Sequence, residues 1–152
     1  MQTDAMPSWR NVSEERRTFV THLECGLSGE EVEADRLHGL SSIGRPFLVR
    51  YDLDSMAQSL SKETLAERPP DMWRYREFLP VRSIDNVLSL GECMTPLIPA
   101  PGVDGDLWIK DEGRLPTGSF KARGLCLAVS MAKELGVTRM AMPTNGNAGA
   151  AM

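Results

Sequence analysis

"DLWIKDEGRLPTGSFKARGLCLAVSMAKELGVTRMAM" (residues 106–142) is the stretch that decides the predicted fold. Its first residues, 106–110, predict a short strand, and residues 137–142 predict another. Between them, 119–135 predicts a helix that ends before Gly136. A strand, a helix and a second strand joined by short loops are typical of a βαβ unit with a parallel sheet. The sequence therefore predicts an α/β fold.

Lys121 lies in an unusual place on this predicted helix. The apolar side chains recur at steps of three and four residues and form one stripe, made of Leu125, Ala128, Val129, Ala132 and Leu135. Lys121 precedes Leu125 by four residues, so it falls on the side that we expect to be buried. Burying an ammonium is costly unless it is paired or neutralised. Composition alone favours a solvated surface lysine, whereas this position favours a functional one.

The glycines near Lys121 raise the question of a phosphate-binding loop. Gly113 and Gly118 have the spacing G-x-x-x-x-G, but Ser119 stands where such a loop needs a lysine, and Lys121 comes two positions later. The pattern therefore excludes a P-loop. Turns on either side of Pro116 are the simpler explanation of the two glycines.

Composition and charge narrow the class of protein. Apolar residues make up 41% of the chain and charged residues 25%, which is typical of a globular protein. The net charge is −4 without a basic cluster, so we expect no nucleic-acid partner. No apolar run has the length of a membrane span or a signal peptide, which predicts a cytoplasmic protein without a membrane partner. Three widely spaced cysteines suit reduced thiols.

Four segments that differ in composition and apolar pattern follow one another along the chain. Residues 1–18 are polar and predict a loosely packed arm, and 19–53 contain short apolar runs that predict a small β unit. Residues 54–86 predict a helical linker region with a short helix that Pro80 ends. The α/β pattern occupies 87–152.

Three motifs, read together, carry a family resemblance. They are "SLGECMTPL" (89–97), "KDEGRLPTGSFKARG" (110–124) and "PTNGNAGAAM" (143–152). In this order they resemble the signatures of fold type II pyridoxal-phosphate-dependent enzymes, most closely the threonine synthases. The second is the most specific, because Ser119, Lys121, Arg123 and Gly124 match the setting S-x-K-x-R-G of the family's cofactor lysine. Cys93 departs from the first motif, where the family usually has glycine.

The resemblance implies a role for each matching residue. Lys121 corresponds to the catalytic lysine that forms a Schiff base with pyridoxal 5'-phosphate, and a helix N-terminus there would disfavour its protonated amine. Asn147 corresponds to the asparagine that hydrogen-bonds the cofactor's ring hydroxyl. Thr144, Asn145 and Gly146 correspond to the loop that receives the substrate carboxylate, as backbone N–H groups at a helix start do. Asn145 departs from the small or hydroxyl residue usual there, which leaves substrate choice open.

The implied whole enzyme converts O-phosphohomoserine and water to threonine and phosphate, with Lys121 as the main base. Its family members are two-domain α/β proteins of several hundred residues, with a homodimer expected for the full-length enzyme. The alanine-rich segment 143–152 has no helix-stop signal, so we expect a fragment that is inactive alone. The resemblance places the cofactor's phosphate loop beyond it. Two alternatives remain: another type II enzyme, such as a threonine dehydratase or a β-replacing synthase, or a non-catalytic truncated module.

Some threonine synthases carry a small zinc-ribbon-like unit upstream, which this sequence resembles without its ligands. The resemblance aligns His22 and Cys25 with the first ligand pair, and Leu40 and Ile43 with the second. Two aliphatic side chains cannot bind zinc, so we expect no metal. We also expect apolar packing of Leu40 and Ile43 to replace the metal, and His22 to be an ordinary surface residue.

Overall fold

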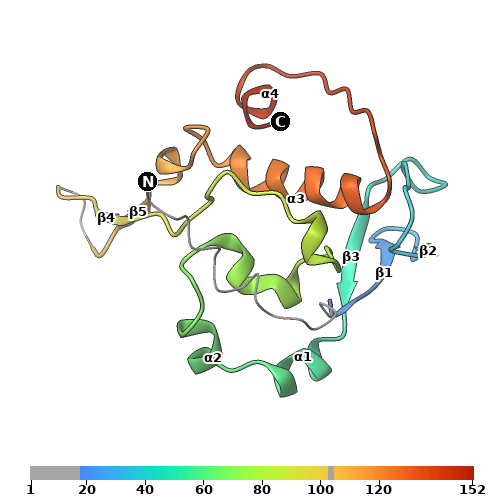
Figure 1. Ribbon diagram of the computed structural model, residues 1–152, viewed down its shortest axis with the longest axis horizontal. Helices are drawn as coiled ribbons and strands as arrows, with labels where there is room; N and C mark the ends of the chain where they lie inside the picture. Colours follow the sequence, from blue (N-terminus) through green and yellow to red (C-terminus); the bar gives the residue numbers. More distant parts are fainter. Residues whose placement is uncertain (1–17, 103–104) are drawn as a thin grey trace, which may run out of the picture.

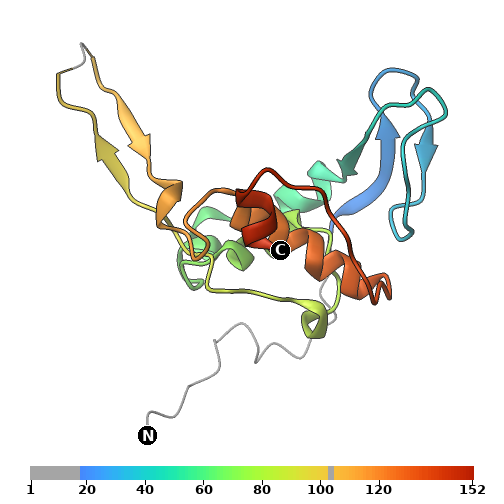
Figure 2. The ribbon, with the colours of Figure 1, turned by 90° about the horizontal axis from the view of Figure 1, so that it is seen from above.

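The computed structural model describes residues 18–102 and 105–152, and the predicted polar arm lies outside these residues except for Thr18. A helical centre carries two β units that extend from opposite sides of it (Figures 1 and 2). The mixture of helices and strands agrees with the expected α/β class. None of the helices in the described ranges has the length and apolar character of a bilayer-spanning helix.

The first β unit is a three-stranded antiparallel sheet within the segment expected to be β. It contains β1 (Val20–Cys25), β2 (Glu31–Val32) and β3 (Phe47–Tyr51) in the order β2-β1-β3. Gly29 and Gly44 have φ angles of 71° and 73°, which glycine adopts without steric cost, and they allow the tight turns that follow Cys25 and Ser41. The predicted boundaries of the segments stay predictions.

Three short helices follow the sheet, and each is preceded by a residue that caps its N-terminus. They are α1 (Leu53–Ser59), α2 (Lys62–Ala66) and the 3-10 helix Met72–Phe78. Side-chain oxygens of Asp52, Ser61 and Asp71 accept hydrogen bonds from the backbone N–H three residues later, which satisfies donors that a helix start leaves free. Leu79 ends the third helix directly before Pro80, as the sequence predicted.

Helix α3 (Lys121–Glu134) is the longest element, and Gly136 ends it as expected. The N–H of Gly136 donates to the carbonyl of Lys133 (3.1 Å) and that of Val137 to the carbonyl of Ala132 (2.8 Å). With Gly136 at a φ of 73°, these bonds form a Schellman C-cap.

Residues 82–95, which we call the strap, run along α3 in the opposite direction. Glu134 accepts hydrogen bonds from the backbone N–H groups of Arg82 and Ser83, while the ammonium of Lys133 donates to the carbonyl of Asp85. Two further side chains of α3 bind the strap backbone: Ser130 accepts a hydrogen bond from the N–H of Leu88, and Arg123 donates to the carbonyl of Cys93. Four polar side chains along α3 thus hold the strap. The chief apolar cluster lies beneath the strap and consists of Trp73, Val81, Val87 and Cys126.

The buried side of α3 differs from the predicted stripe. Ala122, Cys126 and Ser130, at steps of four residues, are buried. Of the predicted stripe, Ala132 is buried as expected, whereas Ala128 is exposed. The prediction was wrong for Ala128, because α3 has small or apolar side chains on two sides. Periodicity finds an apolar side but does not tell which partner is available to cover it.

The second β unit contradicts the predicted parallel sheet. Strands β4 (Leu97–Pro99) and β5 (Trp108–Lys110) pair antiparallel with each other, and residues 137–142 form no strand within the described chain. A parallel strand needs a neighbour that satisfies its N–H and C=O groups. Among the described residues no strand lies beside 137–142, so this segment stays irregular and leads to α4 (Asn147–Ala151).

Candidate functional site

Lys121 is the first residue of α3, and the turn before it has a tight geometry. Gly118 has a φ of 71°, and its N–H donates to the carbonyl of Leu115 at 2.7 Å. Phe120 precedes the helix without a side-chain hydrogen bond that caps it. Lys121 is half-buried, with its Nζ 5.0 Å from the centroid of the Phe120 ring. In the part of the chain that the structure describes, no carboxylate forms an ion pair with this amine.

Two hydroxyl groups in the same turn are buried without a hydrogen-bond partner. They belong to Thr117 and Ser119, and Ser119 is buried as a whole residue. A buried polar group without a partner loses its hydration and gains nothing in return. Such groups concentrate at functional sites, and these two lie within four residues of Lys121.

The acid nearest in sequence, Glu112, instead binds Arg123. The Nε of Arg123 donates to Oε2 of Glu112 (2.6 Å) and its Nη2 to Oε1 (3.0 Å), a bidentate pair. Thr95 donates its hydroxyl proton to the same carboxylate. These hydrogen bonds lower the pKa of Glu112 to about 2, and those from Arg123 have the larger effect. The Glu112 carboxylate in turn raises the pKa of Arg123. Lys110 donates to the Thr95 carbonyl at 3.0 Å.

The loop that contains Thr144, Asn145 and Gly146 has a conformation that only its glycines permit. Thr144 Oγ1 accepts hydrogen bonds from the N–H groups of Gly146 (3.0 Å) and Gly149 (2.8 Å). Gly146 has a φ of 139°, and a Cβ at Gly149 would lie 2.5 Å from Cγ2 of Thr144. Asn145 and Asn147 are exposed, and Asn147 is the first residue of α4.

Helices α3 and α4 contact each other, and α4 lies beside α3 in both ribbon views (Figures 1 and 2). The elements that carry Lys121 and Asn147 are therefore packed together, although they are far apart in sequence. The Glu112–Arg123 pair was not predicted from the sequence. The sequence offered one signal for this pair, which is that Arg123 stands in the motif around Lys121 and Glu112 closely follows the preceding strand.

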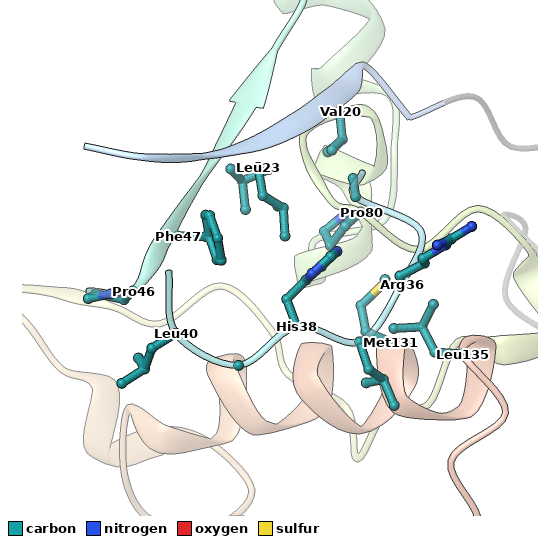
Figure 3. Close-up of a pocket in the computed structure, with 14 residues that line it drawn as sticks. Val20, Leu23, Arg36, His38, Leu40, Pro46, Phe47, Pro80, Met131 and Leu135 are labelled. Carbon is teal, nitrogen blue, oxygen red and sulfur yellow. The ribbon is translucent and has the colours of Figure 1, made fainter. Parts of the chain in front are cut away.

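A surface groove elsewhere contains none of the predicted site residues. It lies between the first β unit and the C-terminal half of α3 and has a volume of about 400 Å³ (Figure 3). Leu23, Phe47, Pro80, Met131 and Leu135 contribute to its largely apolar lining. The ion pair of Arg82 with Asp35 (2.9 Å) joins the strap to the residues before the groove's 36–40 segment. The groove therefore lies where the first β unit meets α3, and it is separate from the predicted site.

The residues aligned with zinc ligands take positions that correct the packing hypothesis. Leu40 is 66% exposed and Ile43 is 50% exposed, so neither replaces a metal by packing. Cys25 is fully buried, and hydrogen bonds from the hydroxyls of Ser28 and Ser41 are the main causes that lower its thiol pKa to about 7. The hypothesis was wrong because Leu40 and Ile43 both lie in the connection between β2 and β3, whose residues are mostly exposed.

His22 bonds to the Thr21 hydroxyl and lies 3.6 Å from a Glu31 carboxylate oxygen. It is half-exposed on β1, and the described residues contain no cluster of three or more side chains that could hold a metal ion.

Comparisons with known proteins identify similar sequences. Residues 88–152 match a family described as "Pyridoxal-phosphate dependent enzyme". A threonine synthase of Methanocaldococcus jannaschii is 33% identical over 133 residues, which cover 84% of this chain and 33% of that protein. A threonine synthase of Synechocystis is 45% identical over 83 residues, 51% of this chain and 22% of that protein.

A third relative carries a different name. The 2-amino-4-ketopentanoate thiolase beta subunit of Acetoanaerobium sticklandii is 41% identical over 73 residues, 48% of this chain and 15% of that protein. The chain thus spans a third or less of the length of these relatives. No solved structure is significantly similar to it.

Proposed function

Because residues 88–152 match the family of pyridoxal-phosphate dependent enzymes, we propose that the chain is part of a threonine synthase-like enzyme that converts O-phosphohomoserine and water to threonine and phosphate. The observation that carries the proposal is the length of one match. The 133 residues similar to the threonine synthase of Methanocaldococcus jannaschii extend well upstream of the 65-residue family segment 88–152. A shared catalytic segment alone would not produce so long a match.

Cofactor binding by Lys121 is supported by features of its own turn. A primary amine condenses with an aldehyde only when unprotonated, and a neighbouring carboxylate would favour the protonated form. In the described chain Lys121 has no such neighbour in an ion pair, and the hydroxyls of Thr117 and Ser119 are available as polar partners. These residues therefore fit the cofactor. When bound, pyridoxal phosphate supplies an electron sink for a carbanion next to the substrate nitrogen.

The remaining roles follow the loop geometry. We propose that Asn147 hydrogen-bonds the ring hydroxyl of the cofactor, since it begins α4, the helix that packs against α3. We assign the backbone of Thr144, Asn145 and Gly146 to the substrate carboxylate. Thr144 binds the N–H groups of Gly146 and Gly149 and so orders this loop before any ligand arrives. Lys121, at the start of α3, would move protons at the substrate carbon.

One experiment tests the cofactor assignment. The folded chain is mixed with pyridoxal phosphate, reduced with borohydride, and digested so that the modified lysine is identified by mass spectrometry. We expect the label on Lys121 and its loss in Lys121→Ala, whereas Lys133→Ala keeps it. Lys133 is the matched control because it is an exposed α3 lysine that binds the carbonyl of Asp85 (2.6 Å). A folded chain without label on Lys121 would favour the non-catalytic alternative.

The reaction needs a separate assay, because the thiolase subunit shows that similar sequences occur in enzymes with other names. An enzyme that contains this chain is supplied with O-phosphohomoserine or with threonine, and the products are separated. Threonine and phosphate from the first substrate support the proposal. Loss of ammonia from threonine, without reaction of O-phosphohomoserine, would support a dehydratase instead.

A further inference from the structure

Arg123 connects the turn that contains Lys121 to the rest of the chain. It lies two residues after Lys121, and its guanidinium binds both carboxylate oxygens of Glu112 while donating to the carbonyl of Cys93 at 2.8 Å. The first turn of α3 is therefore bound to the strap and to the 3-10 helix Glu112–Arg114 at once. A bidentate arginine–carboxylate pair restricts orientation as well as distance.

Glu112 is itself held by two further residues, Thr95 and Lys110. The Thr95 hydroxyl donates to it, and that hydroxyl accepts a hydrogen bond from Lys110 Nζ at 2.6 Å. The Nζ of Lys110 also lies 3.8 Å from Oε1 of Glu112. Both partners of the Arg123 pair are about a quarter exposed, so solvent screens the pair only in part.

The cations around this turn are divided unequally among the acids. Arg123 and Lys110 lie against Glu112, and Arg114 pairs with Asp111 at 2.9 Å. Of the four cations in the described segment 110–123, Lys121 is the one that forms no ion pair. Arg123 thus pairs with Glu112, the acid nearest to Lys121 in sequence.

We propose that Glu112 is a positioning residue, which orients Lys121 through Arg123 by fixing the first turn of α3. The inference rests on the proposed function, because it concerns how Lys121 meets the aldehyde of the cofactor. Glu112 need not touch that group. Its effect is to hold the backbone of Lys121 where the amine attacks, and a displacement on the order of 1 Å can cost a reactive group on the order of a hundredfold in rate.

Glu134 provides a matched control at the other end of the same helix. Its carboxylate accepts hydrogen bonds from the N–H groups of Arg82 (2.8 Å) and Ser83 (2.9 Å) and so also joins α3 to the strap. It lies thirteen residues from Lys121 by number (134 minus 121). Loss of either carboxylate removes an anchor of α3, but only Glu112 acts on the turn that contains Lys121.

The test measures the rate at which pyridoxal phosphate and borohydride label Lys121 between pH 7 and pH 10, corrected for the folded fraction. Rates are compared at the highest value of each pH profile, which we call the plateau. We expect Glu112→Gln to lower the plateau on the order of tenfold and Glu134→Gln to leave it within about twofold. The charge swap Glu112→Arg with Arg123→Glu should recover part of the loss.

Arg123→Lys covers the case in which Glu112→Gln does not fold. It keeps the charge and loses the bidentate geometry, so it should also lower the plateau. Wild-type labelling with an unchanged plateau in the folded variants would overturn the positioning role and leave the proposed function standing. Absence of label on Lys121 in the wild type would instead count against the proposed function.

Discussion

At the scale of single residues, Gly149 shows how contacts restrict the predicted substrate loop. Sequence marks this position only as part of a glycine-rich motif. In the folded chain a Cβ there would meet the side chain of Thr144, whose hydroxyl also accepts the hydrogen bond from the Gly149 N–H. The glycine is required by close approach, whereas Gly146 is required by its φ of 139°.

We expect Gly149→Ala to destabilise this loop by about 1–3 kcal/mol, because the methyl group displaces Thr144 from its two N–H donors. The amide of Gly146 should then exchange with solvent at least about fivefold faster in hydrogen-exchange mass spectrometry or NMR.

Gly124→Ala is the control for this substitution. Its Cβ would meet nothing within 4 Å, and alanine is the better helix former, so we expect unchanged loop exchange and a gain of about 0.5–1 kcal/mol. Equal exchange at Gly146 in wild type and Gly149→Ala would contradict the argument from close approach.

At the scale of elements, α3 and the strap are joined by polar side chains that face inward. Ser130 is fully buried; its hydroxyl accepts a hydrogen bond from the N–H of Leu88 (2.9 Å) and donates one to the carbonyl of Cys126 (2.8 Å). Cys126 donates to the carbonyl of Leu88 at 2.9 Å, and burial is the main cause that raises its thiol pKa to about 12. It is therefore a structural thiol and stays protonated at neutral pH.

We expect Ser130→Ala to lower the free energy of unfolding by about 1–2 kcal/mol, because it removes the hydroxyl that accepts the hydrogen bond from the N–H of Leu88 and donates one to the carbonyl of Cys126. Urea denaturation followed by tryptophan fluorescence measures this change, since Trp73 belongs to the cluster beneath the strap.

Ala128→Ser is the control on the exposed side of the same helix. It should cost less than about 0.7 kcal/mol, the range of intrinsic helix preference. If the two variants lose equal stability, the hydrogen bond to the strap is not what holds α3.

At the scale of the whole molecule, the β4–β5 hairpin extends from the helical centre (Figure 2). Its strands carry exposed apolar side chains. Ile98 pairs with Ile109 on one face, and Pro99 pairs with Trp108 on the other. Trp108 is 56% exposed, and the neighbouring strand residues are exposed as well. Apolar surface of this kind favours association.

We expect the purified chain to self-associate with rising concentration and Trp108→Thr to weaken that association about tenfold, the loss that corresponds to one large apolar side chain. Sedimentation velocity measures it. Leu27→Ser is the control, because Leu27 is 70% exposed in the turn between β1 and β2, away from the hairpin. An equal effect of both variants would indicate nonspecific association.

The sequence by itself determined features that depend on a few neighbouring residues. The extent of α3, its end at Gly136 and the family resemblance around Lys121 are of this kind. Helix periodicity and the φ angles that glycine permits are local properties, so they can be read without knowing the fold.

Only the tertiary structure decided which surfaces and partners meet. It chose the Ala122–Cys126–Ser130 side of α3 for burial, paired β5 with β4 instead of a parallel neighbour, and exposed Leu40 and Ile43. It also joined Glu112 to Arg123 and kept Lys121 out of ion pairs within the described chain. These outcomes depend on which groups compete for the same partner, and that competition takes place between segments far apart in sequence.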